Sequence, residues 1–180
     1  METEEQLLNA IRSGDQLAFR RLYDRYSGYA MAIALRYIPE RSEVNDVLQD
    51  SFIKILTSIG QFSYRGEGSL RNWIARIVAH QAIDYIRRRE RISFVNISSE
   101  EVADDDADMG EMPSEILMEM IGRLPVHYRV MLNLFVFEQL THKEIAQLLG
   151  IRERTSSSLF YRAKHQLKKM IKDYLDHQTI

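Results

Sequence analysis

Apolar residues recur along this chain at spacings of three and four, which is the period that brings side chains to one face of an α-helix. Near the start, Leu7, Leu8 and Ile11 form one such group, and a second group runs through 17–26. Gly14-Asp15 separates them, so the pattern predicts two short amphipathic helices. A strand-like alternation never extends beyond a few residues, and the pattern therefore predicts an all-α protein.

More helices are predicted in both halves of the chain. In the first half they cover about 27–38, a segment from near Ser42, and a segment from an N-cap at Ser69 to about Arg91. In the second half they cover 114–122, 125–137, 141–149 and 153–175. Only "ISFVNI" (92–97) could form a short extended segment.

Charge is distributed unevenly along the chain, although the net charge is only −2. Residues 1–91 hold 14 Lys/Arg and 12 Asp/Glu, 92–115 hold 8 acids and no base, and 116–180 hold 10 bases and 6 acids. The acidic stretch is poor in large apolar side chains, so it cannot bury enough surface to offset its ordering entropy. We therefore predict two small helical domains, 1–91 and 114–180, joined by a flexible acidic linker at 92–113.

Composition excludes several classes of protein. The chain has no Cys, and its five His show no metal-ligand spacing. No nucleophile–base pairing is evident, so we expect no enzyme, no cofactor, no metal and no small-molecule substrate. The longest uncharged apolar stretch, "YSGYAMAIAL", is about half the roughly 20 residues of a membrane span. We expect a cytoplasmic protein without membrane insertion.

The segment "HKEIAQLLGIRERTSSSLFYRAK" (142–164) has the layout of a helix-turn-helix. Ile145, Leu148 and Leu149 form an apolar face, and the small Ala146 leaves room for a second helix to cross closely. Gly150 suits a left-handed turn, and a basic helix follows. Its inward stripe is predicted to be Phe160, Ala163, Leu167, Met170/Ile171 and Tyr174. Seven bases and one acid lie between Arg152 and Lys172, a charge that alone fits a solvated face equally well. Together with the spacing of Ala146, Gly150 and Ile151 it favours DNA binding.

The first half carries a second basic helix, "WIARIVAHQAIDYIRRRER", preceded by a loop that holds Phe62, Tyr64 and Arg65 together with Gly66 and Gly68. An aromatic ring and a cation on a loop are what an unpaired base requires, namely a face for stacking and a charge for its phosphate. Trp73 and Phe62 are better explained as anchors of this loop. In "NDVLQDSF" (45–52) the polar residues are compatible with either a solvated face or a protein-docking face.

Taken together, these segments resemble the extracytoplasmic-function (ECF) group of bacterial sigma factors. "FRRLYDRYSGYAMAIALRYI" is similar to that family's first helices, and "DVLQDSFIKIL" to its polymerase-docking helix. "GSLRNWIARIVAHQAIDYIRRR" is similar to the segment that reads the −10 element. The stretch from Leu124 to Leu167 is similar to the domain that reads the −35 element. The resemblance covers nearly all of the chain.

The resemblance implies roles for three sets of residues. Those that would bind core RNA polymerase are Asp46, Gln49, Asp50 and Phe52. Those that would surround the melted −10 strand of promoter DNA are Tyr64, Arg65, Arg71, Arg76, His80, Arg87 and Arg88. Those that would face the −35 groove are Arg152, Glu153, Arg154, Thr155, Ser157, Ser158, Tyr161, Arg162, Lys164 and Lys168. Family behaviour also implies an anti-sigma factor that covers both DNA faces.

The chain departs from the family pattern at a few positions. Asn45 stands where Glu is usual and His80 where Asn is usual, while Ser156 and Leu159 replace a packing Val and a basic residue. Two alternative functions remain. A stand-alone helix-turn-helix regulator explains 141–172 but not the first half, and a helical signalling adaptor requires neither basic face.

Overall fold

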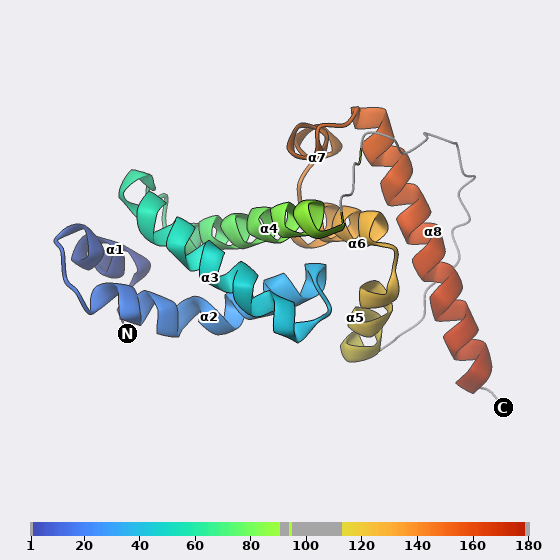
Figure 1. The fold of residues 1–180 in the computed structure, drawn as a ribbon, viewed down its shortest axis with the longest axis horizontal. Coiled ribbons are helices and arrows are strands. Elements are labelled where there is room, and N and C mark those ends of the chain that lie inside the picture. The colour runs from blue at the N-terminus through green and yellow to red at the C-terminus, as the bar shows by residue number, and fades with distance from the viewer. Residues whose placement is uncertain (1, 91–93, 95–112, 179–180) are drawn as a thin grey trace. The chain divides into compact units, whose positions relative to one another are not determined.

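The computed structural model describes residues 2–90, 94 and 113–178 (Figure 1). All regular structure within those residues is helical, which confirms the predicted fold class. The chain divides into two compact units, 1–89 and 90–180. The predicted extended segment at 92–97 lies outside the described residues except for Phe94, and so does the acidic stretch at 98–112. Among the described helices, none is both long and apolar enough for a membrane span.

The first unit consists of α1 (Glu4–Arg12), α2 (Ala18–Tyr37), α3 (Arg41–Ser58), the 3-10 turn η1 (Ile59–Gln61) and α4 (Ser69–Glu90). Each α-helix buries one stripe, as its periodicity predicts. The buried side chains include Leu7, Leu8, Leu22, Ile33, Val44, Ile55, Leu70, Ile74, Val78 and Ile83. The opposite faces remain free to carry charge.

The prediction of separate helices over 17–26 and 27–38 is wrong, because α2 is continuous from Ala18 to Tyr37. Gly28 lies in its interior without ending it. Tyr26, Ala30 and Ile33 on either side of this glycine are all buried, so one apolar stripe runs through the position. Tertiary packing of that stripe outweighs the roughly 1 kcal/mol by which glycine disfavours a helix.

The predicted N-cap of α4 also needs correction, because Ser69 is the first helical residue. Its hydroxyl closes the preceding loop, donating to the carbonyl of Gly66 at 2.6 Å and accepting from the amide of Arg65 at 3.2 Å. Residues before the helix adopt conformations that favour glycine, with a φ of 108° at Gly66 and 89° at Gly68. The helix amides therefore require a cap from elsewhere in the chain.

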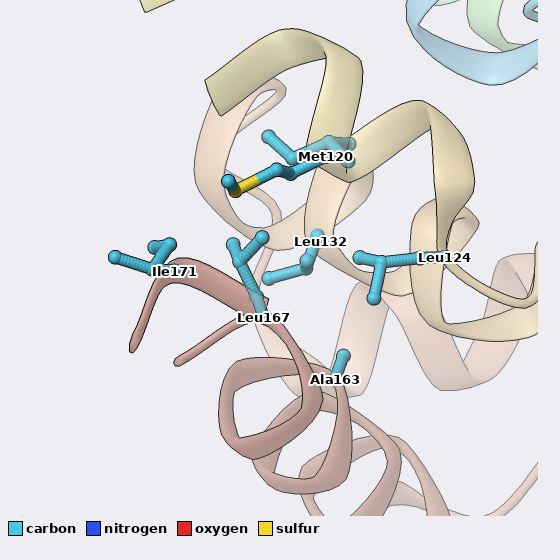
Figure 2. Packing of buried hydrophobic residues seen from close by; sticks show 7 residues of the cluster. Met120, Leu124, Leu132, Ala163, Leu167 and Ile171 are labelled. Carbon is cyan, nitrogen blue, oxygen red and sulfur yellow. The ribbon is translucent and has the colours of Figure 1, made fainter. Parts of the chain in front are cut away.

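The second unit consists of α5 (Ser114–Arg123), α6 (Val126–Leu132), the π-helical η3 (Asn133–Phe137), α7 (His142–Leu149) and α8 (Glu153–Gln178). Figure 2 shows its core, where α5 and α6 pack against α8. The buried cluster is Met120, Ile121, Leu124, Leu132, Ala163, Leu167 and Ile171.

Buried Arg129 joins α5 to α6 in this unit. Its Nη1 donates to the carbonyl oxygens of Gly122 and Leu124, at 2.8 and 3.1 Å. These carbonyls lie at the C-terminal end of α5, where helical partners are lacking. The guanidinium therefore caps α5, which explains how a charged group is tolerated at 8% exposure.

Candidate nucleic-acid interfaces

Helices α7 and α8 form the predicted helix-turn-helix. Thr141 starts α7 with a capping box, in which its Oγ1 accepts from the amide of Glu144 and its own amide donates to Glu144 Oε2. Gly150 ends the helix in the left-handed region, at φ 69° and ψ 33°. The amide of Ile151 then donates to the carbonyl of Ala146, so a single glycine turns the chain into α8.

The buried face of α8 follows the four-residue spacing of Leu159, Ala163, Leu167 and Ile171. Leu159, which replaces the basic residue usual in the family pattern, is 1% exposed and so belongs to the core. Thr155 needs correction as a DNA contact because it is also buried, at 7% exposure. Its position four residues before Leu159 places it on the same inward stripe.

The outer side of α8 begins with an exposed group formed by Arg152 in the turn and Glu153, Arg154 and Ser157 on the first helical turns. Further along, the half-buried side chains are Ser158, Tyr161, Arg162, Lys164 and Lys168. Tyr161 differs from the sequence-based expectation because its hydroxyl is buried, with no hydrogen-bond partner among the described residues. The Lys164 ammonium lies 5.3 Å from the centre of that ring.

His142 is a structural residue of this motif that sequence reasoning missed. Its Nδ1 lies 3.0 Å from Oγ of the fully buried Ser156, and its ring stacks on Phe135 with centroids 4.5 Å apart. Burial lowers the pKa of His142, while nearby Glu153 opposes that shift. The family pattern has a packing Val at position 156. The Ser found there is the signal that could have revealed a polar partner for its hydroxyl.

Three of the predicted −10 residues form one stripe on α4. Arg76, His80 and Arg87 are separated by four and seven residues, so they share a helix face. Arg76 and His80 are exposed, while Arg87 is half-buried and pairs with Asp84 at 3.7 Å. Desolvation lowers the pKa of His80, and the Arg76 and Arg87 charges lower it further against the opposing effect of Asp84.

Arg71 and Arg88 belong to other surfaces of α4. The Arg71 guanidinium lies over the ring of Tyr29 on α2, 4.2 Å from its centroid. Arg88 pairs with Asp50 on α3 at 3.7 Å, and both side chains are at least half exposed. This ion pair links Arg88, which was predicted to contact the −10 strand, to Asp50, which was predicted to bind core RNA polymerase.

The loop before α4 is held by several side chains. Phe62 packs against Trp73 with centroids 5.0 Å apart, which agrees with an anchoring role for this pair. Tyr64 is half-buried and donates from its hydroxyl to Glu67 Oε2 at 3.0 Å, and burial together with this carboxylate raises its pKa. Arg65 is exposed beside it.

The predicted polymerase-binding residues lie on α3. Asp46, Gln49 and Asp50 are exposed, whereas Phe52 is 6% exposed and packs against Tyr23 of α2 with centroids 4.6 Å apart. Phe52 is therefore mainly a packing residue of the helix pair.

A groove of about 680 Å³ lies along α2 and α3 beside these residues. Its lining includes Gln49, Phe52 and the exposed apolar side chains Tyr23, Ile53 and Leu56. Sequence reasoning missed the groove, although Ile53 and Leu56 fall outside the buried stripe of α3. Apolar residues at such positions are the signal that indicates an unpartnered face.

Comparison with known proteins identifies both halves of the chain. The family model described as Sigma-70 region 2 matches residues 22–92, and the model described as Sigma-70, region 4 matches residues 114–167. The two matches follow one another in order and together overlap every described helix except α1.

Relatives align over almost the whole chain. An ECF RNA polymerase sigma-E factor of Haemophilus influenzae is 28% identical, covering 94% of this chain and 95% of its own. An RNA polymerase sigma-H factor of Pseudomonas aeruginosa is 26% identical, covering 97% and 96%.

A similar fold occurs in the sigma factor RpoE of Bartonella quintana, whose structure was solved in complex with the anti-sigma factor NepR. It matches with a TM-score of 0.55 and 20% identity over 87% of this chain and 98% of that one. The two family matches, their order and the full-length relatives lead to one conclusion: the chain belongs to the sigma-70 family, in its extracytoplasmic-function group.

Proposed function

We propose that this protein binds core RNA polymerase and directs transcription initiation at specific promoters. In this proposal the outer face of α8 reads the −35 duplex, and α4 with its preceding loop captures the melted −10 strand. The observation that carries the proposal is that one chain combines a helix-turn-helix with a second, separate basic stripe on α4. A protein that reads only duplex DNA has no use for the second surface.

The proposed −35 contacts divide into two kinds. Arg152 and Arg154 at the start of α8 would bind phosphates, which contributes affinity and salt dependence but little specificity. Ser157 and Ser158 follow within one turn and are short enough to let the helix approach base edges in the major groove. Lys164 and Lys168 would bind the backbone farther along. Thr155 is left out of this set because it is buried.

The proposed −10 surface is suited to single-stranded DNA. Arg76, His80 and Arg87 form a stripe that can follow phosphates, while Tyr64 and Arg65 on the loop supply a ring and a cation for one unpaired base. His80 is largely neutral at neutral pH because its pKa is lowered, so it would act there as a hydrogen-bonding group. Arg71 and Arg88 would contribute only at the margins of this stripe.

The proposed polymerase surface combines carboxylates with an apolar groove. Asp46 and Asp50 are exposed on α3, and the α2–α3 groove is lined by the neighbouring Asn45 and Gln49 and by the exposed apolar side chains Tyr23 and Ile53. This combination suits a helical partner segment with an apolar stripe and a basic edge. The polymerase would supply the chemistry and its metal ions, and this chain would act without catalysis in the cytoplasm, where polymerase and promoter DNA meet.

We also propose that an anti-sigma factor controls this protein, by analogy with the complex known for the Bartonella relative. Covering α8 and α4 together would block both DNA surfaces. The alternative function, a stand-alone helix-turn-helix regulator, shares the α8 contacts but predicts no effect of polymerase.

Mapped transcription from sheared genomic DNA of the encoding organism tests the proposal. Core polymerase with the protein should initiate at discrete sites that share two spaced elements, and core polymerase alone should not. Unchanged, scattered initiation in both reactions would contradict the proposed function.

A further inference from the structure

Glu4 of α1 is a buried carboxylate at the N-terminal end of α4. It is 2% exposed, and its Oε2 accepts from the amides of Gly68 at 2.9 Å and Leu70 at 3.0 Å. Its Oε1 accepts from the amide of Arg71 at 3.1 Å and from the Tyr26 hydroxyl at 2.8 Å. Glu4 is thus the cap that α4 otherwise lacks, supplied from more than 60 residues away.

The same part of α1 also contacts the loop of residues 62–68. The amide of Glu4 donates to both carboxylate oxygens of Glu67 at 3.3 Å, and Glu67 in turn accepts from the Tyr64 hydroxyl. At the other end of α1, Arg12 Nη2 donates to the carbonyl of Phe62. Helix α1 therefore holds both ends of the loop.

Besides these contacts, the loop is fixed by the Ser69 hydroxyl, by the Phe62–Trp73 contact and by the pairing of Arg25 with Glu67 at 3.8 Å. Gly66 and Gly68 both adopt positive φ, and an added Cβ at either would meet no neighbouring atom within 4 Å. Glycines in open space have many accessible conformations, so order must come from hydrogen bonds to another element. Those bonds come mainly from Glu4, Arg12 and Ser69.

We propose that Glu4 and Arg12 are positioning residues for capture of the unpaired base, although neither would touch DNA. This inference rests on the proposed function, because it assigns α1 a role in the −10 step alone. A binding site for one base must be held to within about half an ångström to discriminate among bases. Helix α1 would supply that rigidity to Tyr64 and Arg65.

The hydrogen bonds of Glu4 indicate which substitution is informative. Four donors converge on two oxygens, so Glu4→Gln replaces one acceptor by an NH₂ group that faces N–H or O–H donors. Arg12→Ala removes the second attachment from an exposed position and should leave the fold intact. Tyr26→Phe removes one donor but spares the three backbone bonds. Arg20→Ala removes an exposed arginine that pairs with Asp24 on its own helix. Both are matched controls.

The test uses holoenzyme reconstituted from full-length protein and core RNA polymerase. The probe is a pool of fork-junction DNAs with a fixed duplex and a randomised single-stranded hexamer, and bound DNA is sequenced. Wild-type protein should enrich one base at one unpaired position. Glu4→Gln and Arg12→Ala should reduce that enrichment about tenfold and about threefold, while polymerase binding stays unchanged. Tyr26→Phe and Arg20→Ala should change it less than about twofold.

The outcomes separate the inference from the proposed function. Enrichment retained in both Glu4→Gln and Arg12→Ala would overturn the positioning role and leave the proposed function standing. An equal loss of polymerase binding and of enrichment in Arg12→Ala would also overturn it, since the residue would then act only on stability. Absence of any enrichment with wild-type protein would contradict the proposed function itself, and the inference with it.

Discussion

Nδ1 of His142 lies 3.0 Å from Oγ of Ser156, and this contact joins the first helix of the helix-turn-helix to the second. Ser156 is fully buried, and its hydroxyl also lies 3.6 Å from the sulfur of Met131. A polar contact in the core therefore helps to set the orientation of α8 relative to α7. Unpaired polar groups are costly there, so each partner depends on the other.

A double-mutant cycle should reveal this dependence. His142→Gln and Ser156→Ala should each destabilise the second unit, and their combination should be less harmful than the sum, with a coupling of about 1 kcal/mol. Urea unfolding followed by far-UV circular dichroism measures it. Trp73, the one tryptophan of the sequence, reports separately on the first unit and should not change. Strictly additive effects would show that the contact contributes nothing.

The burial of His142 also predicts that the stability of the second unit depends on pH. Burial holds the pKa of His142 below its ordinary value of 6.5, so the folded state resists protonation while the unfolded state does not. Stability from this group is therefore constant above about pH 6.5, falls as pH drops below it, and levels off below the folded pKa. The second unit should be less stable at pH 5.5 than at pH 7.5.

His142→Gln is the control for that prediction, because it removes the titrating group. His127 also has a pKa lowered by burial, with Arg162 adding to the shift, so part of the acid sensitivity should remain in the variant. The difference between the two pH values should shrink in His142→Gln. An unchanged difference would assign the whole effect to other groups.

The fold could be predicted from the sequence wherever one apolar stripe determined the outcome. Ala163, Leu167 and Ile171 of the inward stripe of α8 follow from spacing, and the Gly150 turn follows from the conformational freedom of glycine. At the start of the stripe the prediction was wrong, because Leu159 is buried and the predicted Phe160 is only half-buried. The division of α2 into helices over 17–26 and 27–38 was predicted wrongly, because one apolar stripe continues across Gly28. Packing of that stripe outweighs the low helix propensity of glycine at this position.

Substitutions of Gly150 and Gly28 by Ala test this interpretation, because they should change stability in opposite directions. Gly150→Ala places a side chain at φ 69° and should destabilise the second unit by about 1–2 kcal/mol. Gly28→Ala lies inside α2 with open space around the added Cβ, and should stabilise the first unit by about 0.5–1 kcal/mol. Circular dichroism and Trp73 fluorescence report on the two changes. Effects of the same sign at both positions would contradict this account of the two glycines.

The salt dependence of duplex DNA binding should depend on the charges at the start of α8 more than on those near its end. Arg154→Ala should weaken duplex DNA binding and reduce the slope of log K against log salt by about one. Lys172→Ala is the matched control, because it removes a charge on the same helix about 27 Å away. Fluorescence anisotropy of labelled duplex over a salt series measures both slopes. Equal slope changes would mean that binding is spread along α8 rather than centred on its start.

The candidate site was less predictable from the sequence than the fold. Residues on one helix could be assigned to a face, as for Arg76, His80 and Arg87. Contacts between distant segments could not, because nothing in the local pattern links Glu4 to the amides of Gly68 and Leu70. The burial of Thr155 was not predicted either, because its polar side chain suggested a position on the outer face of α8.

Co-elution with core RNA polymerase on size exclusion, beside binding to random duplex DNA alone, tests the central claim most directly. The wild-type protein should co-elute, and Asp46→Ala/Gln49→Ala/Asp50→Ala should not, while free duplex is bound weakly by both. Because all three side chains are exposed on α3, the variant should remain folded. Firm duplex binding without any polymerase binding would contradict the account and favour a stand-alone helix-turn-helix regulator.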